Sequence, residues 1–281
     1  MPYHSQRLLK KIIRRLIDAS AVPIAAYLAA VTSNPRFSNA LNNVLSNTLN
    51  TALNTALSNA SQVFKPLDVD FDPVLSLHRE AVLESASFIK DHLATAVLFH
   101  NSNITHFWDF ALSKVSREGL FCEFGVFNGN SINYFADKIP EVTWHGFDSF
   151  AGLPDDWKGW SLPKGTFDLQ GKIPSVRENV ELHKGWFDLT LPEFAGDNAG
   201  KISFMHIDCD LYSSAKTVFE VLGERIQAKT IIVFDEFFNY PGWQEHEYKA
   251  FMEFCAARQA KYSFIAFHEY RAAVMIEGIS R

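Results

Sequence analysis

Acidic side chains stand directly after short apolar runs in the second half of the sequence. Asp148, Asp208 and the pair Asp235–Glu236 each occupy such a position. If the runs are parallel strands of one sheet, their carboxyl ends share an edge and the carboxylates lie close together. Clustered carboxylates are unfavourable unless protons or a cation neutralise them. Oxygen ligands suit magnesium, calcium or manganese, so the pattern predicts a hard divalent cation; the alternative is a helix-capping Asp208 and a solvated acidic pair.

A glycine motif, Glu123-x-Gly125-x-x-x-Gly129-x-Ser131, lies between an apolar run and a helical pattern. Glycine allows the backbone to approach a ligand closely, and the start of a helix offers free amide donors. The spacing differs from the Gly-x-Gly-x-x-Gly fingerprint of dinucleotide-binding proteins, which disfavours a nicotinamide enzyme. A simple turn after a strand also explains the motif. Asp148, after the next run, stands where a doubly wound sheet presents a carboxylate to ribose hydroxyls.

Strand and helix patterns alternate from Gly119 onward and position these residues. Strands are expected at 120–125, 142–147, 180–183, 202–207 and 230–234, with a closing hairpin of 262–267 and 272–276. Helices are expected from 132, over 213–226 and over 245–257. This alternation predicts an α/β fold with a doubly wound, Rossmann-like sheet that binds ligands at the carboxyl ends of its strands.

Four strings around these positions are more specific than any single motif. They read FDSFAGLP at 147–154, KGWF followed by TLP within 184–192, HIDCDLYSS at 206–214 and FDE at 234–236. Together they resemble the macrocin O-methyltransferase family of class I S-adenosylmethionine-dependent methyltransferases, which methylate sugar hydroxyls. The resemblance covers Gly119 to about Phe254, roughly half of the 281 residues, and does not reach residues 1–65.

The resemblance implies a role for each matching position. Glu123, Gly125, Gly129 and Ser131 would surround the methionine end of S-adenosylmethionine, and Asp148 would hold its ribose. Ser149 and the turn Gly185–Trp186 would lie near the adenine or the ribose. Magnesium would be bound by Asp208, Asp235 and Glu236. The sequence departs from the family at Glu236, where the macrolide enzymes usually have a second Asp.

The predicted enzyme is therefore an S-adenosylmethionine-dependent methyltransferase acting on a hydroxyl group. A methyl sulfonium is already activated, so the protein mainly has to align the acceptor oxygen and help it lose a proton. A divalent cation lowers the pKa of a hydroxyl group, and Asp208 is the candidate proton acceptor. The acceptor is a sugar or vicinal diol of a small molecule or glycan. Two alternatives remain: a Rossmann-type oxidoreductase or nucleotide-sugar enzyme, and a non-catalytic, cofactor-binding scaffold.

Three segments are expected: a helical, low-complexity extension (1–65), a helical lid or cap (66–115) and the methyltransferase core (116–281). Basic and apolar pairs within 7–31 favour contact with an anionic membrane surface, with a soluble helix or a cleaved signal peptide as alternatives. Leucines spaced by four between 41 and 57 favour a homo-oligomer or docking on the core; the alternative is a flexible linker.

The composition limits the classes of partner and the compartment. A net charge of −6 argues against a nucleic-acid partner, because phosphate binding needs clustered Lys and Arg. The three cysteines are widely spaced and match neither a disulfide framework nor a zinc motif. We therefore expect a cytoplasmic protein, associated with a membrane if residues 7–31 bind one.

Overall fold

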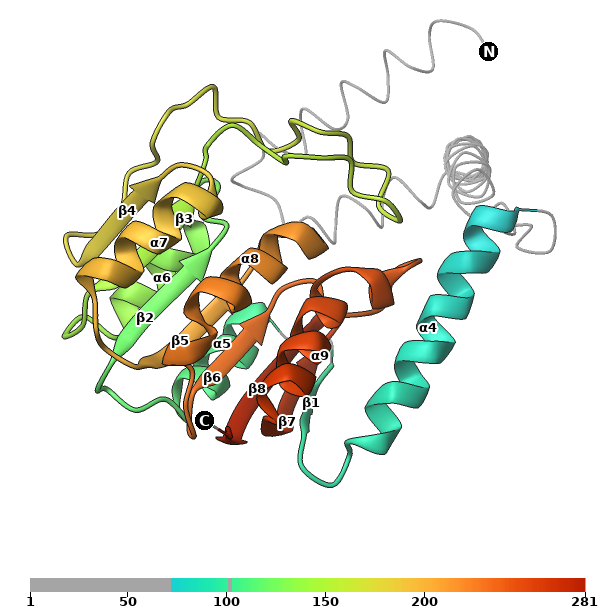
Figure 1. Cartoon of the computed structure of the whole chain (residues 1–281). Helices are drawn as coiled ribbons and strands as arrows, with labels where there is room; N and C mark the ends of the chain where they lie inside the picture. The colour runs from blue at the N-terminus through green and yellow to red at the C-terminus, as the bar shows by residue number, and fades with distance from the viewer. Residues whose placement is uncertain (1–71, 101–102, 281) are drawn as a thin grey trace, which may run out of the picture. The chain divides into compact units, whose positions relative to one another are not determined.

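The computed structural model describes residues 72–100 and 103–280 (Figure 1). The chain divides into the units Met1–Asp68 and Val69–Arg281, so the described residues all belong to the second unit. The predictions of membrane contact through residues 7–31 and of oligomerisation through the leucine repeat lie outside the described residues. Within 72–100 and 103–280, no helix combines the length and the apolar character needed to cross a bilayer.

The described strands form one sheet in the order β1-β7-β8-β6-β5-β2-β3-β4. They are β1 (Val97–Phe99), β2 (Leu120–Phe124), β3 (Trp144–Asp148), β4 (Val180–Lys184), β5 (Ile202–Ile207), β6 (Ile231–Phe234), β7 (Lys261–His268) and β8 (Arg271–Gly278). Strand β8 runs antiparallel to its neighbours β6 and β7, and the other pairs are parallel. From β2 the sheet extends through β3 to β4 on one side, and through β5 to β6 on the other. The strand order therefore reverses between β2 and β5, and doubly wound sheets bind ligands in the crevice at such a point.

Helices cover both faces of this sheet (Figure 1). They are α4 (Pro73–Asp91), α5 (Ile104–Leu112), α6 (Asn130–Lys138), α7 (Phe187–Asp197), α8 (Tyr212–Leu222) and α9 (Glu247–Arg258). Alternate residues of a strand point to opposite faces, and β2 divides accordingly: Cys122 and Phe124 pack with α7, α8 and α9, while Phe121 packs with α5 and α6. The predicted α/β doubly wound fold is confirmed.

The described part of the segment expected as a helical lid or cap also contains a strand. A short strand, β1, separates α4 from α5 and pairs with β7 at the edge of the sheet. Helix α4 packs through Phe88, whose ring lies 5.2 Å from Phe264 and 5.8 Å from Trp243 between ring centroids. Three apolar residues, Val97–Phe99, are too few for a periodic signal in the sequence, so the available edge of β7 decides their conformation.

Candidate functional site

A cavity of about 570 Å³ lies at the carboxyl ends of β2, β3, β4, β5 and β6. Its walls contain residues that directly follow these strands, together with the loop after β3 and the first turn of α8. The wall residues are Gly125, Phe127, Asp148, Ser149, Gly152, Leu153, Pro154, Trp157, Phe167, Gly185, Trp186, Phe187, Asp188, Asp208, Cys209, Asp210, Ser213, Ser214, Thr217 and Glu236. No residue of 72–100 or 103–115 is among them. Strand-end placement thus brings most of the predicted site residues to one cavity.

The loop after β2 is shaped by Gly125 and Asp148. Gly125 has φ +92°, and a Cβ there would lie 1.6 Å from the carbonyl oxygen of Asp208, so only glycine fits. Oδ2 of Asp148 accepts hydrogen bonds from the amides of Val126 (2.8 Å) and Phe127 (2.7 Å). Its Oδ1 accepts from the amide of Phe150 at 2.6 Å. The Asp148 carboxylate therefore holds two loops in place while it faces the cavity.

Aromatic rings and the turn after β4 complete this wall. The amide of Gly185 donates to the carbonyl of Asp148 (2.9 Å), which joins the turn to β3. Trp186, 41% exposed, follows Gly185 and precedes α7. Phe127 and Phe167 meet edge to face with centroids 5.4 Å apart, and both remain about 40% exposed. Ser149 Oγ accepts from the amide of Ala151 at 3.1 Å. Exposed aromatic faces of this kind bind flat rings.

A group of three carboxylates lies on the same cavity wall. One oxygen each from Asp208, Asp210 and Glu236 lies within 4.8 Å of the other two. Oε2 of Glu236 is buried, and among the described residues it has no hydrogen-bond partner. Burial is the main cause that raises the pKa of all three, and the charge of Asp235 raises each further; that of Asp210 reaches about 7. The group therefore needs protons or a cation at neutral pH.

Asp235 does not join this group, although the sequence predicted it as a metal ligand. Both of its oxygens accept hydrogen bonds from Arg271 of β8, at 2.6 and 3.0 Å. Burial by itself would raise the pKa of Asp235, but His206 and Arg271 outweigh that effect and hold it below its usual range. Asp210 takes the third position in the group instead, because its carboxylate has no competing cation within the described contacts.

His206 lies between two buried carboxylates and is fully buried itself. Its Nδ1 is 3.3 Å from Oε2 of Glu123, and its Nε2 is 3.9 Å from Oδ1 of Asp235. Burial lowers the pKa of a histidine, but Asp235 and Glu123 outweigh burial and raise that of His206 to about 10. At neutral pH the ring is a buried cation that holds the ends of β2, β5 and β6 together.

Glu123, Gly129 and Ser131 are not on the cavity wall. Glu123 is fully buried, and its Oε1 accepts from Ser131 Oγ at 2.8 Å. Gly129 has φ +81° and immediately precedes α6. Ser131 of α6 is thus linked through Glu123 to His206. Of the four motif residues named in the sequence analysis, Gly125 lines the cavity.

Glu247, at the start of α9, binds the backbone of the loop that carries Asp208 and Asp210. It is fully buried, and its Oε1 accepts from the amides of Cys209 (3.2 Å) and Asp210 (3.1 Å). Burial, followed by the charge of Asp210, raises the pKa of Glu247 well above its ordinary value. This shift favours the neutral acid, and its Oε1 holds the loop that carries Asp208 and Asp210.

Sequence reasoning missed Asp210, Arg271 and Glu247. Asp210 stands within the quoted string HIDCDLYSS, so its two-residue spacing from Asp208 was a usable signal. Arg271 and Glu247 carry no local signal, because each reaches the site from a distant element. Neither His246 nor His268 lines the cavity; His246 Nε2 lies 2.9 Å from the carbonyl oxygen of Lys158.

Comparison with known proteins gives the enzyme class. Residues 122–237 match a family model described as a methyltransferase domain. This range includes the glycine loop, Asp148 and the carboxylate group. The match confirms the predicted class, an S-adenosylmethionine-dependent methyltransferase, over the oxidoreductase and nucleotide-sugar alternatives. No curated protein matches the sequence.

Several solved structures resemble the chain at low identity. CalS11, described as a calicheamicin methyltransferase, is 22% identical, covers 60% of this chain and 79% of its own, and has a TM-score of 0.49. The O-methyltransferase NovP is 18% identical, with coverages of 62% and 76% and a TM-score of 0.44. An O-methyltransferase from Bacillus cereus in complex with SAH is 16% identical, with coverages of 80% and 96% and a TM-score of 0.42. Likenesses at this level concern the fold.

Glu247→Ala should destabilise the protein by about 2–4 kcal/mol, because two buried amides lose their acceptor. Glu247→Gln is the matched control: a neutral amide oxygen still accepts from both amides, so its free energy of unfolding should stay within about 1 kcal/mol of the wild type. Urea unfolding followed by circular dichroism measures both. Equal destabilisation of the two variants would contradict the assigned role of Glu247.

Arg271→Met should cost about 3–5 kcal/mol of stability, since it removes both hydrogen bonds of Arg271 to the buried Asp235 and leaves only the more distant His206 as a cationic partner. Arg258→Met is the control, because the ion pair of Arg258 with Glu224 is largely solvent-exposed and its loss should cost less than about 1 kcal/mol. Thermal unfolding compares the two variants. A similar, small shift for both would show that the Arg271–Asp235 pair does not hold the strand ends together.

Proposed function

We propose that this methyltransferase transfers a methyl group from S-adenosylmethionine to a hydroxyl group of a small molecule or glycan, with a divalent cation at Asp208, Asp210 and Glu236. One observation carries the proposal: Asp148 and the three carboxylates line the same 570 Å³ cavity. A methyl donor and a hydroxyl acceptor have to meet in line within one space. A cavity of this size accommodates both reacting ends.

The cofactor side of the proposal rests on the loops around Asp148. A carboxylate offers about four lone-pair positions, and the amides of Val126, Phe127 and Phe150 use three of them. Asp148 also lines the cavity, so its remaining acceptor position suits a ribose hydroxyl. Gly125 allows close approach of the backbone, and Trp186 offers an exposed ring beside the same wall. Ser149 and Gly185 line this part of the cavity as well.

The cation is supported by the carboxylate group itself. An all-oxygen donor set suits magnesium or another hard divalent ion, and the unpartnered Oε2 of Glu236 needs such a ligand. The longer side chain of Glu236 reaches the group, so Glu in place of Asp does not exclude it. When bound, a magnesium ion would supply positive charge that favours the ionised form of an acceptor hydroxyl.

The residues of the chain perform the remaining steps. Asp208 lines the cavity and is the candidate to accept the proton of the acceptor hydroxyl. Glu247 holds the loop that positions Asp208 and Asp210. Leu153, Trp157 and Phe167 supply apolar walls that exclude water and contact the acceptor. A sugar or a vicinal diol fits a site that combines oxygen ligands with aromatic rings.

Asp148→Asn should weaken the binding of S-adenosylmethionine and S-adenosylhomocysteine by about 10–100-fold, because a charged acceptor is lost. Calorimetric titration measures this effect, and unfolding curves establish that the variant is folded. Asp137→Asn is the control, since Asp137 is exposed on α6 and pairs with Arg177 away from the cavity. Unchanged affinity in Asp148→Asn would contradict the ribose role, and no binding to the wild type would contradict the cofactor.

Magnesium should raise the melting temperature more at pH 8 than at pH 5. The folded-state pKa of Asp210, about 7, lies above its unfolded value near 4. Its stabilising contribution is therefore complete below pH 4 and is lost as the pH rises through about 7, unless a cation replaces the proton. Asp210→Asn should remove most of the magnesium effect at pH 8 and lower methyl transfer at least tenfold.

Asn is a matched substitution at position 210, because Asp210 has φ +66° and Asn tolerates this left-handed conformation. Differential scanning calorimetry at both pH values, with and without magnesium, measures the stabilisation. Magnesium stabilisation that is equal at pH 5 and pH 8, or unchanged in Asp210→Asn, would show that the cation does not bind at this group.

A further inference from the structure

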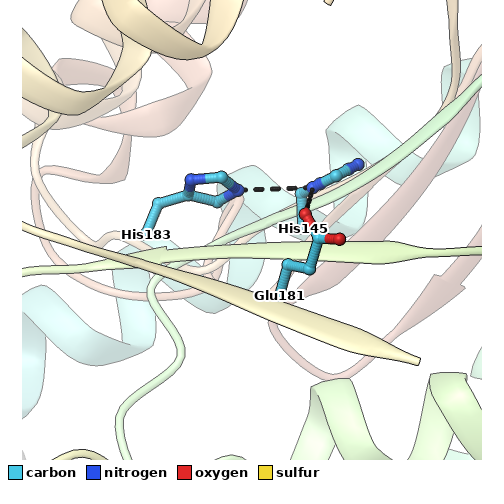
Figure 2. A group of neighbouring side chains, drawn as sticks. All are labelled: His145, Glu181 and His183. Carbon is cyan, nitrogen blue, oxygen red and sulfur yellow. Dashed lines mark hydrogen bonds and ion pairs between the residues drawn. The ribbon is translucent and has the colours of Figure 1, made fainter. Parts of the chain in front are cut away.

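Two neighbouring strands place three potential metal ligands together, outside the cavity described above. His145 lies on β3, and Glu181 and His183 lie on the edge strand β4 (Figure 2). In the parallel register His145 is opposite Glu181. Residues two apart on a strand share a face, so His183 projects from the same face as Glu181. Figure 2 shows the three side chains converging on this face of the sheet.

The distances within this group match those between ligands of one ion. His145 Nδ1 is 3.3 Å from His183 Nε2 and 3.5 Å from Glu181 Oε2. One ligand atom from each residue lies within 4.8 Å of the other two. In a tetrahedral zinc site with bonds of about 2.0–2.1 Å, neighbouring ligand atoms are about 3.4 Å apart. Hydrogen bonding explains the arrangement less completely. Nδ1 of His145 carries either one hydrogen or one lone pair, yet both His183 Nε2 and Glu181 Oε2 lie close to it.

Aromatic packing fixes both imidazole rings. His183 stacks on Phe147 with centroids 4.5 Å apart, and Phe194 of α7 lies 4.8 Å from the His145 ring and 5.2 Å from the His183 ring. Burial is the main cause that lowers the pKa of His145 and of His183. The side chain of Glu181 is 64% exposed, which leaves room for water as a fourth ligand.

We propose that His145, Glu181 and His183 bind a zinc ion, with water as the fourth ligand. Two imidazoles and one carboxylate form a donor set that suits zinc, whereas the all-oxygen group at the cavity suits magnesium. A bound ion would join the edge strand β4 to β3. Its ligand His145 lies three residues before Asp148, and its ligand His183 lies two residues before Gly185. The site stabilises the strand ends that carry the cofactor loops. It stands independently of the proposed methyl transfer.

Cobalt(II) titration tests this site, because tetrahedral cobalt with imidazole ligands absorbs visible light strongly and cobalt in an all-oxygen octahedral site absorbs weakly. The full chain, without an affinity tag, is stripped with a chelator and titrated in excess magnesium. We expect one equivalent of the strongly absorbing species, which zinc displaces. Glu181→Gln and His183→Gln should each weaken cobalt binding at least tenfold.

His106→Gln is the control, since His106 is an exposed histidine on α5, and it should bind cobalt like the wild type. Circular dichroism establishes that each variant is folded; Glu181→Gln alters an exposed side chain and provides the test if His183→Gln unfolds. A wild type without the strong absorption, or a folded Glu181→Gln with unchanged affinity, would overturn the proposal. Neither outcome affects the S-adenosylmethionine titration.

Discussion

Neutralisation of buried negative charge is the constraint on which the carboxyl edge of this sheet depends. Six acidic side chains meet there: Glu123, Asp208, Asp210, Asp235, Glu236 and Glu247. Each would be unfavourable if it were ionised and unpaired in the interior. His206 pairs with Glu123 and Arg271 pairs with Asp235. Burial raises the pKa of Glu247, which favours its neutral form. The remaining three, Asp208, Asp210 and Glu236, line the cavity.

The paired charges and the cavity-lining carboxylates are different sets of residues. The ionic network of Glu123, His206, Asp235 and Arg271 connects β2, β5, β6 and β8, and none of its members lines the cavity. Among residues 72–100 and 103–280, Asp208, Asp210 and Glu236 form no ion pair with a Lys or Arg, and they line the cavity. In the proposed function, the paired charges beneath the cavity hold these carboxylates in position, so little reorganisation would be needed on binding a cation.

The two proposed metal sites lie at different places on the same sheet. The carboxylates follow the ends of β5 and β6, near the reversal of strand order, so they open into the crevice. The His145, Glu181 and His183 group comes from inside β3 and β4, on the face covered by α7. Its ligands are spaced by the sheet register itself, which suits a stabilising ion. Strand-end loops suit a reacting site, because their side chains can face solvent and ligand together.

The sequence alone indicated which residues stand at the ends of strands, and therefore much of the site. The apolar runs that end on Asp148 and Asp208 predicted strands. A short apolar run is visible in the neighbouring residues of the sequence alone. Gly125 was identifiable for the same reason: a tight turn after a strand needs a positive φ. The family resemblance added the cofactor class, which the match over residues 122–237 confirmed.

Tertiary structure alone decided which acidic residues face the cavity. Asp210 and Asp235 both follow strands, and nothing local distinguishes them as ligands. The antiparallel register of β6 with β8 pairs Phe234 with Ala272, and so brings Arg271 beside Asp235. An ion pair across 36 residues of sequence then removes Asp235 from the group and leaves Asp210 in its place. Such a choice depends on charge balance among distant elements, which a local sequence pattern cannot contain.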